Sequence, residues 1–336
     1  MRRILVHGFG SIGQRHLRVI GALEPKAELA VLSEYGTHEW ARERPRRLFT
    51  SLDDALAFRP DAVVVANAAV AHLASAGVWL RAGANVLVEK PLAASSDGLD
   101  ALAALAQDSG RTLQVGYNLR QAAGLKVMRQ WCEQRRLGRV HSARVEVGQH
   151  LHAWRAGRDP LLSVSAQRPL GGGALLELSH EIDYLQWLLG PVTWVAAQLL
   201  RQGRWNIDVE DTALLTLGVA GADGCVASLQ MDFVRHDTTR RCTLIGEQGS
   251  LQWDALAGCL RWQAAGESEW EIVDQSAPEG EATYRAQWQA FAASCRTGAP
   301  PAVTVEDGAR VLRVVDAARR SAAAEGRRMP VEPLQA

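Results

Sequence analysis

Cysteine is scarce in this sequence, and its placement excludes the usual chemistry of that residue. The five cysteines are odd in number and widely spaced: Cys132, Cys225, Cys242, Cys259 and Cys295. Disulfide frameworks and zinc sites need paired or closely spaced thiols. We therefore expect free thiols in a reducing cytoplasm, and no metal site.

An excess of one sign of charge is also missing, as is any long apolar run. Lys+Arg and Asp+Glu both number 37, so no bulk basic field favours binding to nucleic acid. The uncharged stretch 62–80 contains Asn67, His72 and Ser75, which makes it a poor membrane span. The N-terminus lacks the long apolar region of a signal peptide. We expect a cytoplasmic protein that binds neither nucleic acid nor membrane.

The sequence has the length and composition of a two-domain globular protein. Its 336 residues are 47% hydrophobic and 22% charged, which suits about two domains. In residues 1–120, short apolar runs alternate with helical patterns, beginning with the run 3–7 and the helix 13–23. Near-continuous apolar strands separated by helices indicate a parallel sheet covered on both faces. We therefore predict a doubly wound α/β domain, of the Rossmann type, over residues 1–120.

The pattern changes in residues 121–336. Strand-like segments follow one another with few helices between them: 140–149, 192–200, 212–219, 226–234, 242–245, 251–253 and 260–263. Two helical segments, 284–296 and 305–324, close the chain. This order predicts an α+β domain with a large, mostly antiparallel sheet. A broad sheet with one uncovered face would need burial, so we expect a homodimer or homotetramer.

A glycine-rich turn follows the first predicted strand. Gly8, Gly10 and Gly13 fit the pattern GxGxxG, with Ser11 and Ile12 between the last two. The first glycine permits a tight turn, the second lets the backbone approach a pyrophosphate, and the third permits close packing of helix on strand. The N-terminus of the following helix favours anionic phosphates. The turn predicts a dinucleotide site, with a glycine-rich loop that binds no ligand as the alternative.

The residue expected to contact the ribose lies at the end of the second predicted strand. Glu34 follows Gly13 by about 20 residues, the usual separation for an acid that binds the ribose hydroxyls. A carboxylate there favours NAD because it repels the 2′-phosphate of NADP. Four arginines follow, and they could instead serve NADP or form a solvated basic face: Arg42, Arg44, Arg46 and Arg47.

A helical pattern over residues 175–189 places one histidine opposite an apolar stripe. The stripe recurs at spacings of three and four residues: Leu175, Leu178, Ile182, Leu185 and Leu189. At about 100° per residue, His180 lies on the other face with Glu177, Glu181 and Tyr184. We expect one helix that packs through its leucines and presents His180 outward.

Several segments resemble one enzyme family. A Glu-Lys-Pro motif at residues 89–91 follows the predicted strand 85–88. Three further features agree: residues 114–120, the glycine run 171–173 followed by His180, and residues 246–251 with the final helix. Together with the GxGxxG turn, they resemble the glucose–fructose oxidoreductase / inositol dehydrogenase (Gfo/Idh/MocA) family over almost the whole chain.

The resemblance implies an NAD(P)-dependent oxidoreductase that acts on a carbinol carbon of a sugar, sugar derivative or cyclitol. It assigns the catalytic lysine to Lys90 and the proton-transfer histidine to His180. An imidazole suits removal of the hydroxyl proton, and an ammonium group stabilises developing alkoxide charge. The family usually has an aspartate four residues before the histidine. Here Glu177 stands three residues before it, and we expect it to orient His180 or to bind a substrate hydroxyl.

The motifs and the resemblance together define the expected contacts. Cofactor contacts are expected from Gly8, Gly10, Ser11, Ile12, Gly13, Glu34, Asn67, Glu89 and Lys90. Substrate contacts are expected from Asn118, Trp154, Arg158, Arg168 and His180. The polar stretch 152–168 suits sugar stacking and recognition of a carboxylate or phosphate, which favours an acidic sugar such as a uronate, a nonulosonate or a nucleotide sugar. A solvated loop is the alternative.

Two other functions stay open at this point. Some relatives hold NAD tightly and use it transiently for glycoside cleavage, dehydration or epimerisation without net redox change. A noncatalytic, cofactor-bound regulator is the third hypothesis, and the presence of both Lys90 and His180 argues against it.

Overall fold

The computed structural model describes residues 1–34, 36, 41–153, 159–220, 224–276 and 280–333. The chain divides into two compact units, called here the first unit (1–118 and 281–309) and the second unit (119–280 and 310–336). The backbone therefore passes between them after residues 118, 280 and 309. The boundary expected at residue 120 lies close to the first of these crossings.

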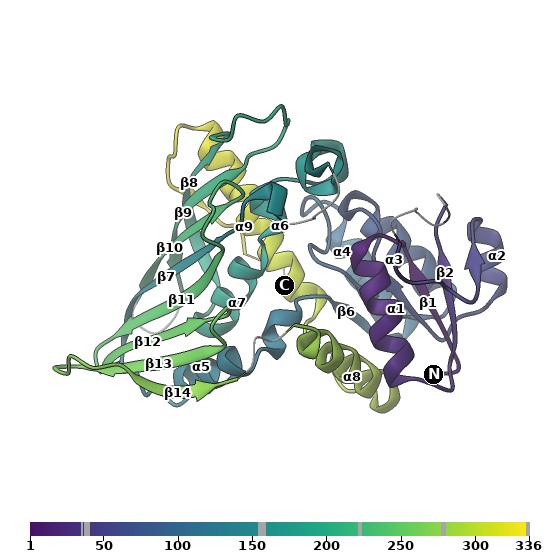
Figure 1. The fold of residues 1–336 in the computed structure, drawn as a ribbon, viewed down its shortest axis with the longest axis horizontal. Helices are drawn as coiled ribbons and strands as arrows, with labels where there is room; N and C mark the ends of the chain where they lie inside the picture. The colour runs from purple at the N-terminus through teal and green to yellow at the C-terminus, as the bar shows by residue number, and fades with distance from the viewer. Residues whose placement is uncertain (35, 37–40, 154–158, 221–223, 277–279, 334–336) are drawn as a thin grey trace. The chain divides into compact units, whose positions relative to one another are not determined.

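The first unit is built on a six-stranded parallel sheet in the order β3-β2-β1-β4-β5-β6 (Figure 1). Its strands are β1 (Arg3–His7), β2 (Glu28–Leu32), β3 (Leu48–Phe49), β4 (Ala62–Val65), β5 (Asn85–Val88) and β6 (Leu113–Val115). Every residue of β4 is buried, as expected for a central strand with helices over both faces. The doubly wound α/β fold is confirmed.

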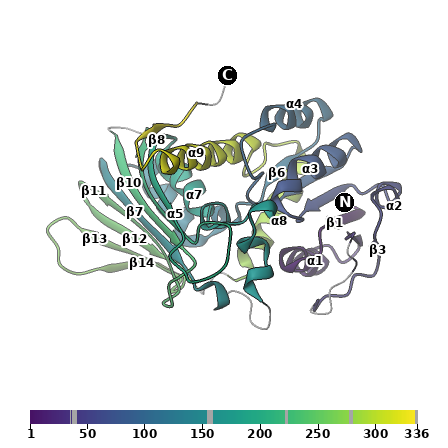
Figure 2. The same ribbon diagram turned by 90° about the horizontal axis from the view of Figure 1, so that it is seen from above.

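Helices cover the sheet of the first unit on both sides. They are α1 (Ser11–Leu23), α2 (Leu52–Ala57), η1 (Ala69–Ala71), α3 (His72–Arg81), α4 (Leu99–Ser109) and α8 (Ala282–Thr297). Helix α1 contacts α8 and α3 contacts α4, and the two pairs lie on opposite faces (Figure 2). In α8, Trp288 and Phe291 are buried in the same core as Ile4 and Val31. Residues 281–309 therefore group with the first unit in space, because the apolar face of α8 completes this core.

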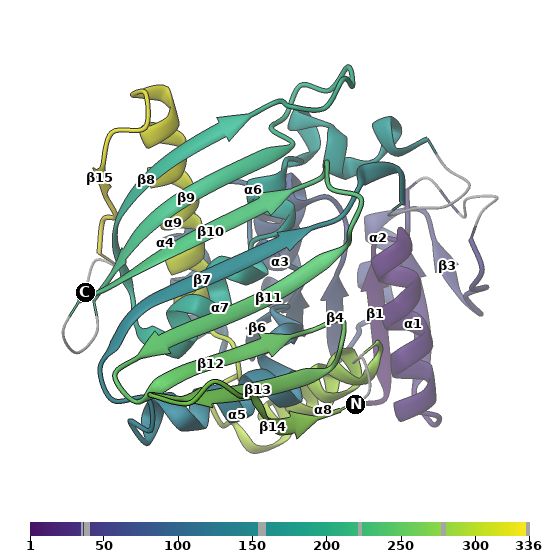
Figure 3. The same cartoon turned by 60° about the vertical axis from the view of Figure 1, so that its left-hand side comes forward.

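The second unit holds a nine-stranded sheet in the order β14-β13-β12-β11-β7-β10-β9-β8-β15 (Figure 3). Its strands are β7 (Val140–Gly148), β8 (Val192–Leu200), β9 (Thr212–Val219), β10 (Cys225–Asp232), β11 (Thr239–Gly246), β12 (Gly249–Asp254), β13 (Cys259–Ala264), β14 (Glu271–Gln275) and β15 (Met329–Pro330). The sheet is mostly antiparallel, as expected, but β10 pairs parallel with β7.

Among the described residues, helices cover one face of this sheet. Its helices are η2 (Asn118–Gln121), α5 (Ala123–Glu133), η3 (Leu151–Ala153), η4 (Pro160–Leu162), η5 (Val164–Ala166), η6 (Arg168–Leu170), α6 (Ala174–Glu177) and α7 (His180–Leu189), with α9 (Val305–Ala323) entering from the first unit. Along β10, residues 225, 227, 229 and 231 are buried, while 226, 228 and 230 are exposed. Helices α5, α7 and α9 lie on the buried side (Figures 2 and 3). In the part of the second unit that the structure describes, no helix covers the other side.

Residues 175–189 do not form one helix, which corrects an expectation. Helix α6 ends at Glu177 and α7 begins at His180, with a turn between them. Glu181 and Tyr184 are fully buried and His180 is 7% exposed, so the polar face does not point to solvent. The reason is that α7 packs against both α5 and β7, which leaves little of it open to water. Of the described helices, none is both long and apolar enough to cross a bilayer.

The place of α8 in the first unit gives a stability prediction. Phe291→Ala should lower the free energy of unfolding by about 3–5 kcal/mol, because it leaves a cavity in the core. Gln289→Ala, an exposed site on the same helix, should change it by less than about 0.5 kcal/mol. Urea titration followed by tryptophan fluorescence measures both. Equal shifts of the unfolding midpoint would contradict the burial of α8.

Candidate functional site

The strand ends of the first unit bring the predicted cofactor residues to one edge of the sheet. His7 pairs with Leu32 on one side and with Val65 on the other, and Val65 pairs with Val88. The residues that follow these ends are Gly8, Ser33 and Glu34, Ala66 and Asn67, and Glu89 and Lys90. They share the carboxyl edge, where parallel α/β sheets bind their ligands.

The structure leaves no room for a side chain at two of the three motif glycines, and the third lies in open space. Gly8 has φ +108°, and a Cβ there would lie 2.6 Å from the backbone of Ala66 and Asn67. A Cβ on Gly13 would overlap the carbonyl oxygen of Gly8, whereas one on Gly10 would meet nothing within 4 Å. No side chain caps α1, which begins at Ser11. An open approach at Gly10 beside an uncapped helix N-terminus fits the pyrophosphate of a dinucleotide.

Glu34 and the arginines after it lie beyond β2. Glu34 is exposed. The buried side chain of Gln14, on α1, accepts hydrogen bonds from the backbone N–H groups of Arg42 (2.8 Å) and Glu43 (3.3 Å). Arg44 donates to the carbonyl of Ala41, and Arg47 pairs with Glu28. Arg44 and Arg47, two of the four arginines, are thus engaged in local contacts.

Lys90 follows a buried charged pair. Glu89 accepts a hydrogen bond from His16 of α1, with 2.7 Å between Oε1 and Nε2, and both side chains are buried. The backbone N–H of Lys90 donates to the other carboxylate oxygen of Glu89 at 3.2 Å. Burial alone would raise the pKa of Glu89, but the hydrogen bond and charge of His16, together with Lys90, hold it below its usual value. The pair therefore joins α1 to the turn that carries Lys90.

A second buried histidine joins two of the same loops. His72 Nδ1 lies 2.8 Å from the carbonyl oxygen of Pro91, and Nε2 lies 3.1 Å from that of Asn67. Burial lowers the pKa of His72, so the neutral ring donates to one carbonyl at a time. The Asn67 side chain donates to Ser75 at 2.8 Å. His72 thus holds the loops that carry Asn67 and Lys90 together.

In the second unit, two ion pairs with buried carboxylates lie beside His180 on the first turn of α7. Asp183 accepts two hydrogen bonds from Arg120, at 2.7 and 3.0 Å, and neither side chain is more than 7% exposed. Glu181 lies 2.8 Å from Nε of Arg240, on β11. An arginine therefore compensates each carboxylate next to His180, as buried charges require. Glu177, on α6, is partly exposed.

The remaining predicted substrate residues have different surroundings. Arg168 donates from its guanidinium to the carbonyl oxygen of Asp208, at 2.6 and 3.0 Å. Asn118, in the first unit, is buried and donates to the Thr283 hydroxyl at 2.7 Å. Trp154 and Arg158 lie outside the described residues.

Sequence reasoning did not assign four residues the supporting contacts that they make in this site. His16 and Arg120 form the buried pairs with Glu89 and Asp183. His72 bridges the loops that carry Asn67 and Pro91. The carboxyl group of Glu210 accepts the backbone N–H of Leu175, at the start of α6. Of these, only His16 had a local signal, a polar residue one helical turn after Gly13 on the buried side of α1.

The buried Glu89 gives a pH prediction. A carboxyl whose folded pKa is lowered stabilises the fold above its unfolded pKa, near 4.5 here, and loses that contribution as pH falls through the folded pKa. Glu89→Gln should therefore lower the free energy of unfolding at pH 7 by about 1.5–3 kcal/mol, and the deficit should shrink as pH falls below about 4.5. Glu28→Gln, in an exposed pair with Arg47, should cost about 0–1 kcal/mol. A pH-independent deficit in urea titrations would contradict the pairing.

Both units match models of a known family. Residues 2–117 match an oxidoreductase family's NAD-binding Rossmann fold. Residues 129–332 match the C-terminal alpha/beta domain of the same oxidoreductase family. The matched ranges cover most of both units.

Individual relatives agree with these matches. The chain is 30% identical over 344 residues to inositol 2-dehydrogenase 2 of Saccharopolyspora erythraea, covering 97% of this chain and 94% of that protein. It is 26% identical over 281 residues to 2,7-anhydro-N-acetylneuraminate hydratase of Mediterraneibacter gnavus, covering 81% and 72%. The structure of GenD2 from gentamicin A biosynthesis, in complex with NAD, superimposes with a TM-score of 0.81 at 27% identity, covering 99% of this chain and 97% of that one. The protein is therefore a member of the Gfo/Idh/MocA family of oxidoreductases, with an NAD-binding Rossmann domain.

Proposed function

We propose that this protein transfers a hydride between nicotinamide and a carbinol carbon of a sugar, sugar derivative or cyclitol. The observation that carries the proposal is the GxGxxG turn, in which Gly8 and Gly13 are packed against backbone while Gly10 is open. The inositol 2-dehydrogenase relative, which matches nearly the whole chain, supports the substrate class. NAD, when bound, supplies the hydride acceptor; NADP is the alternative cofactor.

The proposed chemistry divides between two residues. His180 removes the proton of the substrate hydroxyl, because a neutral imidazole is a base suited to neutral pH. Lys90 donates a hydrogen bond to the same oxygen and stabilises the alkoxide charge that develops there. Glu177 orients His180 or binds a neighbouring hydroxyl. Of the three lysines in the chain, only Lys90 follows a strand at the carboxyl edge of the Rossmann sheet.

An acidic sugar remains the proposed substrate class. Arg168 is exposed and lies close before the glycine run and His180 in the chain. Its guanidinium donates to the Asp208 carbonyl oxygen, so binding of a substrate carboxylate would have to replace or share that contact. We further propose that the protein works in the cytoplasm, where its five free thiols would stay reduced.

A second function has an observation in its favour. The relative from Mediterraneibacter gnavus is a hydratase, a name for a reaction without net redox change. The alternative proposal is therefore an enzyme that keeps NAD bound and oxidises its substrate only transiently. The same residues would serve it, since each oxidation at the carbinol carbon would be reversed within one turnover.

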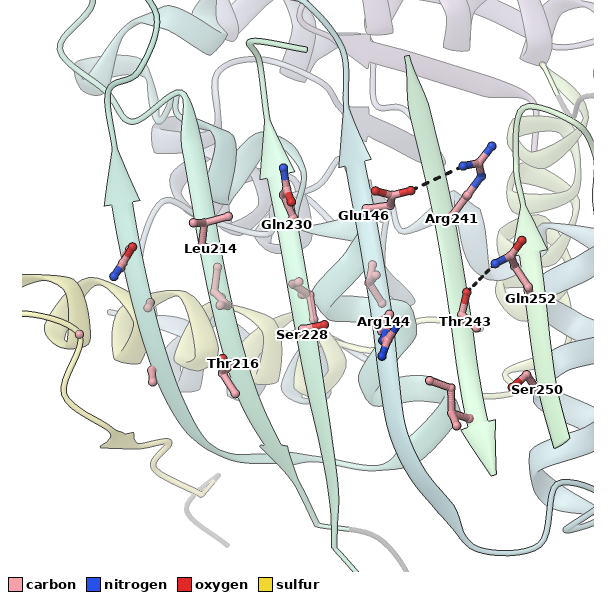
Figure 4. Close-up of a pocket in the computed structure, with 18 of the residues that line it drawn as sticks. Arg144, Glu146, Leu214, Thr216, Ser228, Gln230, Arg241, Thr243, Ser250 and Gln252 are labelled. Atoms are coloured by element: carbon pink, nitrogen blue, oxygen red, sulfur yellow. Dashed lines mark hydrogen bonds and ion pairs between the residues drawn. The ribbon is translucent and has the colours of Figure 1, made fainter. Parts of the chain in front are cut away.

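We also propose that the protein is a homodimer or homotetramer assembled through the uncovered face of the large sheet. The outward residues line a shallow hollow of about 910 Å³, and polar side chains from several strands face into it (Figure 4). Arg241 pairs with Glu146 across β11 and β7, and Gln252 donates to Thr243. A nine-stranded face spans about 40 Å across the strands, which is room for the roughly 800 Å² per partner of a standard interface.

Activity measurements with paired variants test the proposed chemistry. His180→Asn and Lys90→Met should each lower kcat by about 10²–10⁴-fold, while His141→Asn and Lys26→Met, both at exposed sites, should leave it unchanged. NADH formation with a panel of cyclitols, hexoses and uronates measures the effect. Turnover detected by mass spectrometry without net NADH would favour the second function. Full activity of His180→Asn would contradict the proposed proton transfer by His180.

Association through the sheet face has its own test. Sedimentation velocity at micromolar concentration should show a dimer or tetramer for the wild type. Thr216→Arg places a charge at an exposed position on the uncovered face and should shift the protein toward monomer, because an unpaired charge would be buried on association. Thr297→Arg, an exposed control in the first unit, should not. A wild-type monomer would contradict the proposal.

A further inference from the structure

The glycine run before His180 is closely packed. Gly171 and Gly173 have φ of +80° and +108°, values that L side chains rarely adopt. A Cβ on Gly172 would lie 2.7 Å from the carbonyl oxygen of Ser165. The N–H groups of Gly172 and Gly173 donate to the carbonyls of Gln167 and Ser165, each at 3.0 Å. One side of the run is thus fixed by residues 165–167.

The carboxyl group of Glu210 fixes the other side. A Cβ on Gly173 would lie 2.7 Å from Cδ of Glu210 and 2.8 Å from its Oε2, closer than atoms can pack. The same carboxyl group accepts the backbone N–H of Leu175 at 3.1 Å, and the Glu210 carbonyl accepts that of Ala174 at 3.0 Å. The space left by the missing side chain of residue 173 is therefore occupied by Glu210.

Glu210 is itself held firmly against the sheet. The next residue, Asp211, is fully buried, and its carboxylate accepts the N–H groups of Gln202 and Gly203, at 2.9 and 2.7 Å. The Asp211 N–H donates to Leu200, and its carbonyl accepts from Phe233, which ties it to the ends of β8 and β10. Glu210 thus connects the rigid sheet with the start of α6.

The position of α6 sets where Glu177 lies and how the chain enters α7 at His180. Helix α6 has four residues, so its direction is set by the hydrogen bonds at its first turn. The Glu177 N–H donates to the carbonyl of Gly173, and after one turn α7 begins at His180. A shift of Gly173 would therefore move Glu177 and the start of α7 at His180, which follow within about two helical turns.

We propose that Glu210 is a positioning residue for His180, acting by filling the space beside Gly173 and holding the first turn of α6. The inference rests on the proposed role of His180 in proton transfer. Burial raises the pKa of the Glu210 carboxyl, and the Leu175 N–H, Arg319 and Arg168 oppose that rise. Because the carboxyl acts as a hydrogen-bond acceptor and a filler of space, its charge is not required.

Substitutions at Glu210 distinguish the effect of its side-chain volume and hydrogen bonding from the effect of its charge. Glu210→Gln keeps the acceptor and the volume, so kcat should stay within about threefold of the wild type. Glu210→Ala removes both and should lower kcat by about 10–100-fold, the scale of a small misplacement of a catalytic group. NAD affinity, measured by titration of protein fluorescence, should not change in either variant. Glu269→Ala, at an exposed glutamate, is the control.

A double-mutant cycle tests the contact directly. Gly173→Ala should lower kcat in the wild type, because the new methyl group and the Glu210 carboxyl cannot share one space. In the Glu210→Ala background the same change should cost at least threefold less, since the carboxyl is gone; such coupling marks residues in contact. Independent, multiplicative effects would overturn the proposal, as would wild-type activity of Glu210→Ala.

An NMR measurement separates this inference from the proposed function. The protein has nine histidines, and the ring signal of His180 is identified by its loss in His180→Asn. In Glu210→Ala the ring signal and titration midpoint of His180 should move, and in Glu210→Gln they should not. An unmoved signal in Glu210→Ala overturns the positioning role whatever the activity. A moved signal in a protein whose His180→Asn variant is fully active supports the positioning role and refutes only the catalytic one.

Discussion

Compensation of buried carboxylates is the constraint on which both parts of the candidate site depend. A carboxylate removed from water without a partner costs several kcal/mol, so each buried acid needs a donor close by. Glu89 has His16, Asp183 has Arg120, and Glu181 has Arg240. In every case the two partners come from different elements. The pairs therefore fix elements relative to one another inside each unit, and Lys90 and His180 lie next to these fixed points.

The fold was largely predictable because its signals are local. Near-continuous apolar runs such as 62–65 become central strands, and the alternation of buried and exposed residues along β10 follows the pleat. The packing of helix α8 in the first unit could not be predicted from local signals, since its partners Ile4 and Val31 are distant in sequence. The break at residues 178–179 was also missed. A stripe of leucines continues across such a turn, so periodicity alone does not reveal it.

Some residues of the candidate site could be predicted from the sequence, and others could not. The glycine turn could be predicted because the GxGxxG pattern reflects local backbone geometry. At Gly8 and Gly13 the structure has backbone atoms where a side chain would lie. The supporting residues His16, Arg120 and Glu210 could not be predicted. Each acts through a partner more than 30 residues away in the chain, and charged residues are common on any protein surface. Whether Lys90, His180 and Glu177 act as proposed stays a prediction.

The three passages of the backbone between the units have a consequence for synthesis on the ribosome. The first unit needs α8 for its core, and the Val115 N–H at the edge strand β6 donates to the carbonyl of Val303. A nascent chain that has emerged only to residue 118 therefore lacks α8, which covers part of its hydrophobic core. That helix is synthesised only after residues 119–280 have been translated. During that interval its apolar surface is open to chaperones or to aggregation. Residues 119–280 are topologically an insertion in the first unit, so the Rossmann domain becomes complete late in synthesis.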